Sequence, residues 1–507
     1  MNCQATRRDL ERFRSAIIEQ IGLQFDDAKL GFLGEVLQRR LNKLGHSSDT
    51  YLWGLQREAS SGEFTALAHE LTVGETYFFR NIEQFRALAE VALPERMRAD
   101  RAPRTLRLLS AGCSSGEEAY SMAIVARETI ADPSWEILIR AVDLNPAVLE
   151  KAARARYQSW ALRETPPEMQ RKWFRADGRD MVLDAGVRAA VKFEAGNLAS
   201  EDPDLWQPAA YDVVFCRNVL MYFAPEQMRA VIARIAHSLA PGGFLFLGHA
   251  ETLRGISDEF HLRHTHETFY YERKVGTGRA YPPRSAQSPP RSDAKCDDDR
   301  APLAASGDAW FHAIRKATDR VAVLVPSTRA VSPAAGPPAL PWDLAPALDL
   351  LRMERFAAAL DHVRAGPPPA ERDPDVLLLE ATLLAHSGQI RAAEDACRRL
   401  LLSDELNAGA HYVLGLCREQ SGDQDRASEH YRVAAYLDPE FAMPRLHLGL
   451  LARRSGERDA ARRELAQALI LLRREDASRL LLFGGGFSRD AMLALCESAL
   501  RESGGRP

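Results

Sequence analysis

Residues 105–120 have the sequence Thr105-Leu-Arg-Leu-Leu-Ser-Ala-Gly-Cys-Ser-Ser-Gly-Glu-Glu-Ala-Tyr120. An apolar run of strand length leads directly into a turn of small residues, and a helical pattern follows the turn. Small residues at such a turn allow a ligand to approach the backbone at the carboxyl end of the strand. The stretch therefore predicts a strand, a turn and a helix, in which the turn either binds a ligand or only packs the helix against a sheet.

Short apolar runs of the same kind recur along the chain. They lie at residues 136–142, 211–216, 243–248 and 268–273. Strands that alternate with helices predict βαβ units, and therefore an α/β fold with a mainly parallel sheet. The run at 136–142 is followed directly by Asp143. An acidic residue at the end of a second strand can accept hydrogen bonds from both hydroxyls of a ribose.

The turn after the first strand differs from two common phosphate-binding motifs. It contains only Gly112 and Gly116, so it departs from the pattern GxGxxG, and the chain has no GxxxxGK motif followed by Ser or Thr. An adenosine-containing cofactor without a pyrophosphate fits these features better. S-adenosyl-L-methionine is the usual cofactor of this kind, so it is the predicted one.

The chain has 507 residues, which predicts roughly two to four domains. Residues 1–74 carry apolar side chains at helical spacing and predict a small all-α domain. On one of its helices Arg39, Arg40 and Lys43 are expected to face solvent, opposite the leucines. Residues 275–345 contain ten of the 28 prolines, a composition that predicts a flexible linker.

An internal repeat follows the linker. Gly388, Gly422 and Gly456 are evenly spaced along the chain, and Ala393, Ala427 and Ala461 repeat with the same period. This period resembles that of the tetratricopeptide repeat, in which each unit is a pair of helices. Residues 346–505 are therefore predicted to form an α-helical repeat domain whose concave surface binds an unknown peptide or protein.

The composition disfavours several classes of protein. Lys and Arg number 66 against 70 Asp and Glu, without the basic excess that nucleic-acid binding requires. No apolar run reaches the roughly 18 residues of a transmembrane helix and the N-terminus does not resemble a signal peptide, so we expect a cytoplasmic protein. The seven cysteines are scattered and form no CxxC pair, so neither a disulfide framework nor a metal site is expected.

Five segments resemble motifs of the CheR family, whose members are chemotaxis receptor glutamate O-methyltransferases. The segments are Leu71-Thr-Val-Gly-Glu-Thr-Tyr-Phe-Phe-Arg80, Gly112-Cys-Ser-Ser-Gly-Glu-Glu118, Gly196-Asn-Leu198, Phe215-Cys-Arg-Asn-Val-Leu-Met-Tyr-Phe223 and Gly248-His-Ala-Glu251. The resemblance covers about residues 5–274, and the repeats after the linker are similar to those of a CheR subclass with tetratricopeptide tails. It implies a Rossmann-like class I methyltransferase domain at residues 75–274 that binds S-adenosyl-L-methionine.

The resemblance also implies the site residues. The cofactor would be bound by Gly74, Thr76, Arg80, Gly112, Glu117, Asp143, Asn197, Leu198, Arg217 and Asn218. Within this set Thr76, Arg80 and Glu117 would lie at the amino-acid end and Asp143 at the ribose. Arg217 and Tyr222 would be catalytic and face the acceptor. For Glu251, at the end of a strand, a structural role is preferred to acid or base catalysis.

The function implied is methylation of glutamate carboxylates on a chemoreceptor, a methyl-accepting chemotaxis protein, in a chemosensory pathway. The acidic helical bundle of the receptor would contact Arg39, Arg40 and Lys43. An alternative stays open, in which the chain is a catalytically weak scaffold that acts through its tetratricopeptide repeats. Gly74 favours that alternative, because many family members have Asn at this position.

Overall fold

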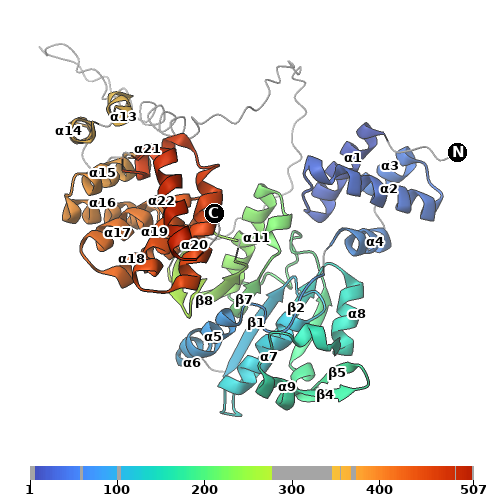
Figure 1. Ribbon diagram of the computed structural model, residues 1–507. Helices are drawn as coiled ribbons and strands as arrows, with labels where there is room; N and C mark the ends of the chain where they lie inside the picture. The colour runs from blue at the N-terminus through green and yellow to red at the C-terminus, as the bar shows by residue number, and fades with distance from the viewer. Residues whose placement is uncertain are drawn as a thin grey trace, which may run out of the picture. The chain divides into compact units, whose positions relative to one another are not determined.

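The computed structural model describes residues 6–57, 61–72, 74–99, 104–249, 251–276, 345–353, 355–366, 373–485 and 487–504. The chain divides into two compact units, Met1–Pro282 and Pro283–Pro507 (Figure 1). Almost all of the predicted linker lies outside the described residues, so the boundaries between the four predicted segments stay predictions.

The first unit begins with a group of helices. They are α1 (Arg7–Ile21), a 3-10 turn (Asp27–Lys29), α2 (Leu30–Leu44), α3 (Ser48–Arg57) and α4 (Ser61–Leu71). Thr6 and Asp9 form a capping box that satisfies free N–H groups at the start of α1. Gly22 ends α1 in the left-handed conformation with a φ of 86°. The apolar faces of α1 and α2 meet in a core that includes Phe13 and Leu33, as their helical spacing predicts.

The expectation that Arg40 faces solvent is wrong. Its side chain is buried, and its Nε and Nη2 atoms donate to the two carboxylate oxygens of Glu63 at 2.9 and 2.6 Å. Tyr51 donates to the same carboxylate at 2.6 Å. Glu63 belongs to α4, a neighbour that the spacing of leucines on α2 cannot reveal. Arg39 is half exposed and Lys43 is exposed, as expected.

The centre of the first unit is a seven-stranded sheet with the order β6-β2-β1-β7-β8-β10-β9. Its strands are β1 (Thr105–Ala111), β2 (Glu136–Asp143), β6 (Val191–Ala195), β7 (Tyr211–Cys216), β8 (Leu239–Leu247), β9 (Phe260–Thr265) and β10 (Thr268–Arg273). The strands from β6 to β8 are parallel, and β10 and β9 pair antiparallel. The α/β fold with a mainly parallel sheet is confirmed. The edge strands β6 and β9 were not expected, because both mix polar and apolar residues.

Helices cover the sheet, and a small second sheet follows α8. The helices are α5 (Ile82–Ala87), a π-helical turn (Leu88–Ala92), α6 (Leu93–Arg98), α7 (Glu117–Thr129), α8 (Pro146–Arg154), α9 (Pro167–Trp173), α10 (Ala185–Ala189) and α11 (Pro225–Ser238), with 3-10 turns at Ser159–Leu162 and Leu220–Tyr222. The second sheet has the antiparallel order β3 (Arg156–Gln158), β5 (Asp180–Leu183) and β4 (Phe174–Asp177). Helix α7 follows β1 and packs against the central sheet (Figure 1).

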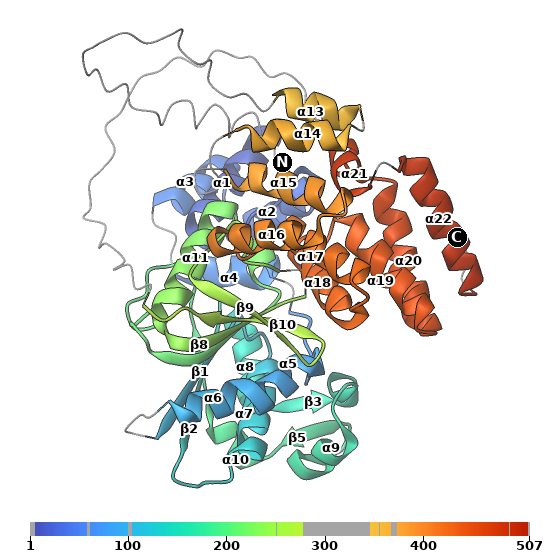
Figure 2. The ribbon, with the colours of Figure 1, turned by 90° about the vertical axis from the view of Figure 1, so that its left-hand side faces the viewer.

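Where the structure describes it, the second unit contains helices and no strand. Its helices are α13 (Ala345–Arg352), α14 (Phe356–Arg364), α15 (Pro374–His386), α16 (Ile390–Ser403), α17 (Ala408–Gln420), α18 (Gln424–Leu437), α19 (Ala442–Arg454), α20 (Arg458–Leu472), α21 (Ala477–Phe483) and α22 (Arg489–Glu502). From α13 to α20 they pack as successive antiparallel pairs (Figure 2). The predicted tetratricopeptide repeats are confirmed.

The repeated residues have the same role in each pair. Gly388, Gly422 and Gly456 turn the chain between the two helices with φ values of 73°, 82° and 80°. A Cβ atom added to Gly415 would lie 2.5 Å from Tyr431, and one added to Gly449 would lie 2.6 Å from Leu465. These two glycines therefore permit the close contact between the helices of a pair.

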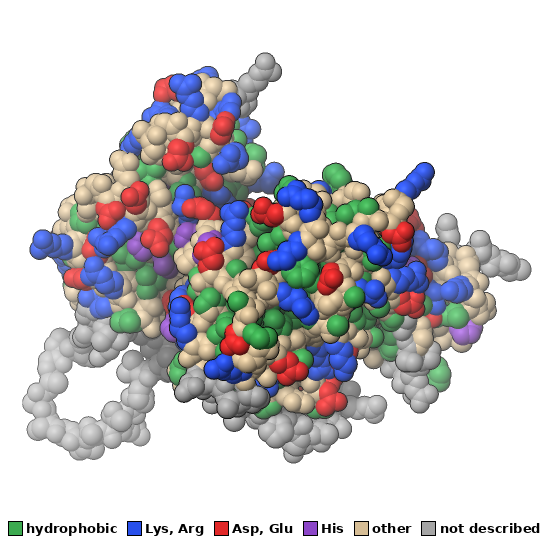
Figure 3. Space-filling model, turned by 90° about the horizontal axis from the view of Figure 1, so that it is seen from below, with side chains coloured by type: hydrophobic (Ala, Val, Ile, Leu, Met, Phe, Trp, Pro, Cys, Tyr) green, Lys and Arg blue, Asp and Glu red, His purple; other side chains and the backbone are tan. Residues whose placement is uncertain are grey.

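The described parts of the chain contain five free cysteines, all buried, and no group of three potential metal ligands. Among the same residues, no helix has the length and the apolar character that crossing a bilayer would demand. Figure 3 shows Lys and Arg side chains interspersed with Asp and Glu on the face that it presents.

Candidate functional site

The first unit contains a pocket at the carboxyl ends of β1, β2 and β7. Of the eleven predicted site residues, ten line this pocket and Glu117 does not. The ten are Gly74, Thr76, Arg80, Gly112, Asp143, Asn197, Leu198, Arg217, Asn218 and Tyr222. Five segments far apart in the chain supply them. Four lie at the carboxyl ends of β1, β2, β6 and β7, which meet at one edge of the parallel sheet, and the fifth precedes α5. The structure thus places the ten residues together, while their individual roles remain predictions.

The two neighbouring acids at the start of α7 point in different directions. Glu117 is buried outside the pocket, where its carboxylate accepts a hydrogen bond from Ser115 at 2.7 Å. Glu118 lines the pocket, and its carboxylate accepts from Ser110 at 2.7 Å. Glu118 therefore lines the pocket and Glu117 does not. A motif match could not separate the two, because adjacent helical residues differ by about 100° in direction.

The loop after β1 and the end of β2 hold each other in place. The backbone N–H groups of Ser114 and Asn145 donate to the two carboxylate oxygens of Asp143 at 2.8 and 2.9 Å. Gly112 has a φ of 80°, and a Cβ atom there would lie 2.4 Å from Val219. Burial raises the pKa of Asp143, although backbone hydrogen bonds oppose that rise. The carboxylate is fixed, and each of its oxygens retains a lone pair for a ligand hydroxyl.

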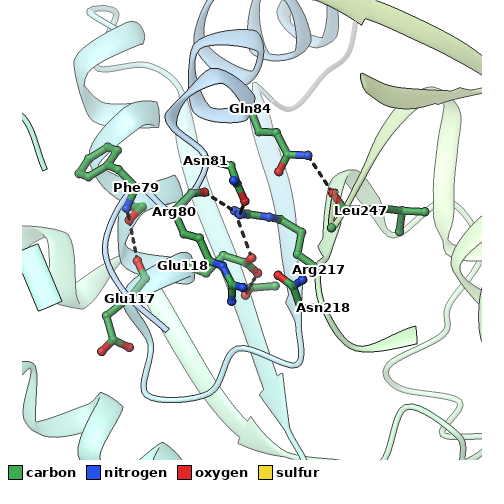
Figure 4. A network of polar contacts seen from close by, with 12 residues as sticks. Phe79, Arg80, Asn81, Gln84, Glu117, Glu118, Arg217, Asn218 and Leu247 are labelled. Carbon is green, nitrogen blue, oxygen red and sulfur yellow. Dashed lines mark hydrogen bonds and ion pairs between the residues drawn. The ribbon is translucent and has the colours of Figure 1, made fainter. Parts of the chain in front are cut away.

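Arg217 is the centre of a polar network beside the pocket (Figure 4). Its Nη2 atom donates to the carbonyl oxygen of Arg80 at 2.6 Å and to the side-chain oxygen of Asn81 at 2.7 Å. Its Nη1 atom lies 3.6 Å from the carboxylate of Glu118. Burial lowers the pKa of Arg217, although the charge of Glu118 opposes that fall. Its Nε atom has no hydrogen-bond partner among the described residues.

Unusual backbone conformations concentrate around this network. Phe79, Asn81, Ser114 and Asn218 have positive φ values between 49° and 58°. They are four of the eight described residues other than glycine with positive φ. Such conformations cost of order 1 kcal/mol or more and persist only where the surroundings impose them. Each of the four is an immediate neighbour of Arg80, Cys113 or Arg217 in the pocket wall, so the surrounding contacts hold this part of the wall in a defined conformation.

The buried carboxylate of Glu251 anchors the loop after β7 from outside the pocket. Its carboxylate accepts hydrogen bonds from the backbone N–H groups of Gly248, Asn218, Val219 and Leu220 at 2.7 to 2.9 Å. The side chain is buried and does not line the pocket. This geometry agrees with the structural role that the sequence favoured for Glu251.

The N-terminal helices also contribute to the pocket, which the sequence did not reveal. Ile21 and Leu23, at the end of α1, line one wall. Asn197 donates to the carbonyl oxygen of Ile21 at 3.3 Å, and the N–H group of Gln24 donates to the carbonyl oxygen of Tyr222 at 2.8 Å. The only available signal was that apolar residues continue past the glycine that ends α1.

The pocket combines three chemical environments that suit S-adenosyl-L-methionine. Apolar side chains such as Leu144 and Val148 can cover a flat ring, and Asp143 can bind ribose hydroxyls. Arg80, Glu118 and Arg217 provide both signs of charge for a zwitterionic amino-acid group. The residues present therefore fit this cofactor. Tyr77, Ser114 and Glu118 also line the pocket and were missed because they flank the motif residues that the resemblance singles out.

Comparison with known proteins agrees with the geometry. Residues 74–269 match the family model described as CheR methyltransferase, SAM binding domain. Chemotaxis protein methyltransferase 2 of Vibrio cholerae is 35% identical over 281 residues, which cover 54% of this chain and 95% of that protein. The probable biofilm formation methyltransferase WspC of Pseudomonas aeruginosa is 30% identical over 465 residues, which cover 89% of this chain and 96% of that protein.

Among solved structures, a thermophilic TPR protein of Thermus thermophilus is 24% identical with a TM-score of 0.24, covering 32% of this chain and 89% of that one. The two relatives above match nearly their full lengths, and the family model covers the cofactor pocket. The chain therefore belongs to the CheR family of S-adenosyl-L-methionine-dependent methyltransferases and carries a tetratricopeptide repeat array.

Proposed function

We propose that the chain methylates glutamate side chains on the cytoplasmic helical bundle of a chemoreceptor and converts their carboxylates into methyl esters. The observation that carries the proposal is the cluster of Arg80, Arg217 and Glu118 at the pocket. The charges of Arg217 and Arg80 both act on the carboxylate of Glu118 there, and these guanidinium groups suit an anionic acceptor. The relatives named as chemotaxis methyltransferases support the same acceptor class.

In the proposed complex each group of the pocket has a separate task. Asp143 binds the ribose hydroxyls, Asn197 and Leu198 border the adenine, and Glu118 with Arg80 binds the amino-acid end. Bound S-adenosyl-L-methionine supplies an electrophilic methyl group on a positively charged sulfur. The backbone near Gly74 takes the position where many family members have an asparagine side chain.

The acceptor chemistry explains why the chain needs no general base. A glutamate side chain with an ordinary pKa of about 4.3 is already ionised at neutral pH. Positioning and exclusion of water should dominate, and ideal orientation can contribute roughly 7–11 kcal/mol. Arg217 is held by the carbonyl of Arg80 and by Asn81, so it orients an acceptor only loosely. Tyr222 lies on the pocket wall, where it can contact the incoming side chain.

The basic face of α2 is proposed to contact the acidic receptor bundle. This face consists of Arg39 and Lys43, because Arg40 is buried and pairs with Glu63 inside the domain. Arg39 also pairs with Glu70 at 2.8 Å, so its contribution to receptor binding is smaller than that of a free guanidinium. Lys43→Glu should therefore weaken receptor methylation more than Arg39→Glu, and added salt should reduce both effects.

The direct test uses the full chain, S-adenosyl-L-methionine with a labelled methyl group, and membranes that contain the chemoreceptors of the same cell. Methylation of glutamate predicts label on a receptor band that is released as methanol by mild base, because esters are base-labile. The scaffold alternative predicts no incorporation even where the chain binds the donor. Label that is stable to base would show a different acceptor and contradict the proposal.

A further inference from the structure

The short helix α21 is not part of any repeat pair, yet it lies on the repeat array. It contacts α13 and α15, and Figures 1 and 2 both show it next to α15. The ring of Phe483, its last residue, packs against Tyr412 on α17 and against Phe441 at the start of α19, with centroid distances of 5.4 and 4.9 Å. Helices α13, α15, α17 and α19 are the first helices of the four pairs. Helix α21 therefore covers the face that the first helices form together.

The array holds the C-terminal end of α21 through both side chains and backbone. Leu482 and Phe483 are buried, with exposed fractions of 0% and 5%. The Nε2 atom of His386 lies 3.1 Å from the carbonyl oxygen of Leu482, and the hydroxyl of Tyr412 donates to the carbonyl oxygen of Phe483 at 3.1 Å. The last carbonyl groups of a helix lack partners within the helix, so these contacts satisfy groups that a bound helical peptide would also present.

A glycine on the array leaves space for the aromatic ring. A Cβ atom added to Gly409 on α17 would lie 3.1 Å from the ring of Phe483 and 2.8 Å from Leu378. The neighbouring repeats do not have a glycine here, since Met443 on α19 and Asp375 on α15 occupy the equivalent positions. The space for Phe483 is therefore a local feature of the face and does not follow from the packing of the repeat.

Polar contacts at Glu475 and Arg479 fix the direction in which residues 475–483, the segment that contains α21, lie on the array. The guanidinium group of Arg479 lies 3.0 Å from the carboxylate of Asp438 and 4.4 Å from the ring centroid of Phe441. The carboxylate of Glu475 accepts from the N–H group of Ala442, the first residue of α19, at 2.7 Å. The segment thus has a basic anchor, apolar anchors and a defined polarity, which are the elements of peptide recognition in a groove.

The connection from α21 to α22 contains glycines, and α22 has its own contacts with the array. Helix α22 packs on α20 and α19, and Arg489 at its start donates to the carbonyl oxygens of Arg473 and Glu475. Gly484 and Gly485 join the two helices, and Gly485 has a φ of 62°. Helix α21 has only seven residues, and helices of this length are unstable in water without tertiary contacts. Its helical state therefore depends on the face that it covers.

We propose that the face formed by the first helices is a peptide-binding surface and that α21 is its internal ligand. A partner binds by displacing α21 with a short helix of the same chemistry, which has a basic residue followed by apolar residues and a C-terminal aromatic residue. Because α21 covers the face in a fraction of the chains, the apparent affinity of the partner for the array is reduced by that fraction. The proposal does not depend on the methyltransferase activity.

The test measures binding of a fluorescent peptide with the sequence of residues 473–485 to the full chain by anisotropy. Phe483→Ala in the chain weakens the internal ligand and leaves the surface intact. We expect this variant to bind the peptide at least about tenfold more tightly than the wild-type chain. A peptide with alanine in place of its phenylalanine should compete poorly. The matched control is Leu495→Ala on α22, which removes a half-exposed leucine away from the face and should behave as the wild type.

A second variant guards against loss of folding. Arg479→Glu places a negative charge beside Asp438 in the chain, while the peptide retains its arginine, so it should also increase peptide binding without opening a cavity. Circular dichroism establishes that both variants keep their helices. Equal, weak binding to the wild-type and Arg479→Glu chains would overturn the proposal and leave α21 as a permanent part of the array.

Discussion

Two carboxylates of the pocket and Glu419 of the repeat array have opposite electrostatic environments. In the pocket, burial raises the pKa of Asp143 and of Glu118, and the neighbouring backbone groups and Arg217 only partly compensate. In the repeat array burial also opposes ionisation of Glu419. There the hydrogen bonds and charges of His447, Tyr431 and Arg454 outweigh it and lower the pKa to about 2.

The contacts explain this difference. Glu419 accepts from the hydroxyl of Tyr431 at 2.8 Å and lies 2.9 Å from His447 and 2.8 Å from Arg454. Its charge is therefore satisfied within the array. Asp143 accepts from backbone N–H groups, and Glu118 has a distant charged partner in Arg217 at 3.6 Å. The carboxylates of Asp143 and Glu118 therefore retain acceptor positions for a ligand. The acceptor positions of Glu419 are used by contacts that stabilise the array.

The two environments predict opposite dependence on pH. An acid whose pKa is raised by folding binds more protons in the folded state, so its contribution to stability declines as the pH rises above its ordinary value of about 4. An acid whose pKa is lowered contributes stability above its ordinary value and loses it as the pH falls.

Replacement of Asp143, the proposed ribose-binding acid, should produce the largest effect. Asp143→Ala removes hydrogen bonds to a charged group that are each worth roughly 1.5–3 kcal/mol, so donor affinity should fall about a hundredfold. Titration calorimetry with S-adenosyl-L-methionine or its demethylated product measures this loss. The matched control is Asp132→Ala, which removes an exposed carboxylate from the loop before β2. Wild-type affinity in Asp143→Ala would remove Asp143 from the site.

Replacement of Glu251 should lower both the stability of the first unit and its affinity for the donor. Glu251→Gln replaces an acceptor of backbone N–H groups with an amide, so some of those donors lose their partner. We expect a loss of about 2 kcal/mol in the free energy of unfolding, together with weaker donor binding. Urea unfolding and calorimetry measure the two quantities. Glu226→Gln, at an exposed position on α11, should change neither.

A glycine of the array should affect stability alone. Gly449→Ala forces a Cβ atom to within 2.6 Å of Leu465, and such overpacking should cost roughly 1–2 kcal/mol. Donor affinity should not change, because the pocket belongs to the other unit. Gly54→Ala on α3 is the control, since no atom lies within 4 Å of the added Cβ. A change in donor affinity in Gly449→Ala would show that the two units are coupled.

The smallest effect concerns Glu419. Its pKa of about 2 against an ordinary 4.5 means that its contribution is present above pH 4.5 and is lost as the pH falls toward 2. Arg454 is half exposed and solvent screens its charge, so we expect a change of about 1 kcal/mol. Urea unfolding of the array at pH 5 and pH 3 should show this difference in the wild type and a smaller one in Glu419→Gln.

Features set by local periodicity could be predicted from the sequence. The strands of the sheet centre are continuous apolar runs, and the repeat glycines recur at a constant spacing, so both were predicted correctly. The edge strands β6 and β9 were missed, because half-exposed strands mix polar and apolar residues. Their existence depends on pairing with neighbours that the local sequence does not specify.

Features that depend on partners distant in the chain could not be predicted. Arg40 is buried because α4 presents Glu63 to it, and no pattern within α2 contains that information. The motif at the start of α7 contains two acids, and only the direction of the helix places Glu118 in the pocket. The wall formed by Ile21 and Leu23 requires the docking of one domain on another.

The hydrogen bonds of Asn197 to Ile21 and of Gln24 to Tyr222 make the N-terminal helices part of the pocket wall. Under the proposed function, a receptor that tilts α1 would shift this wall even without touching the donor. Recognition of the receptor and retention of the methyl donor would then be thermodynamically linked, and each would strengthen or weaken the other by the same factor.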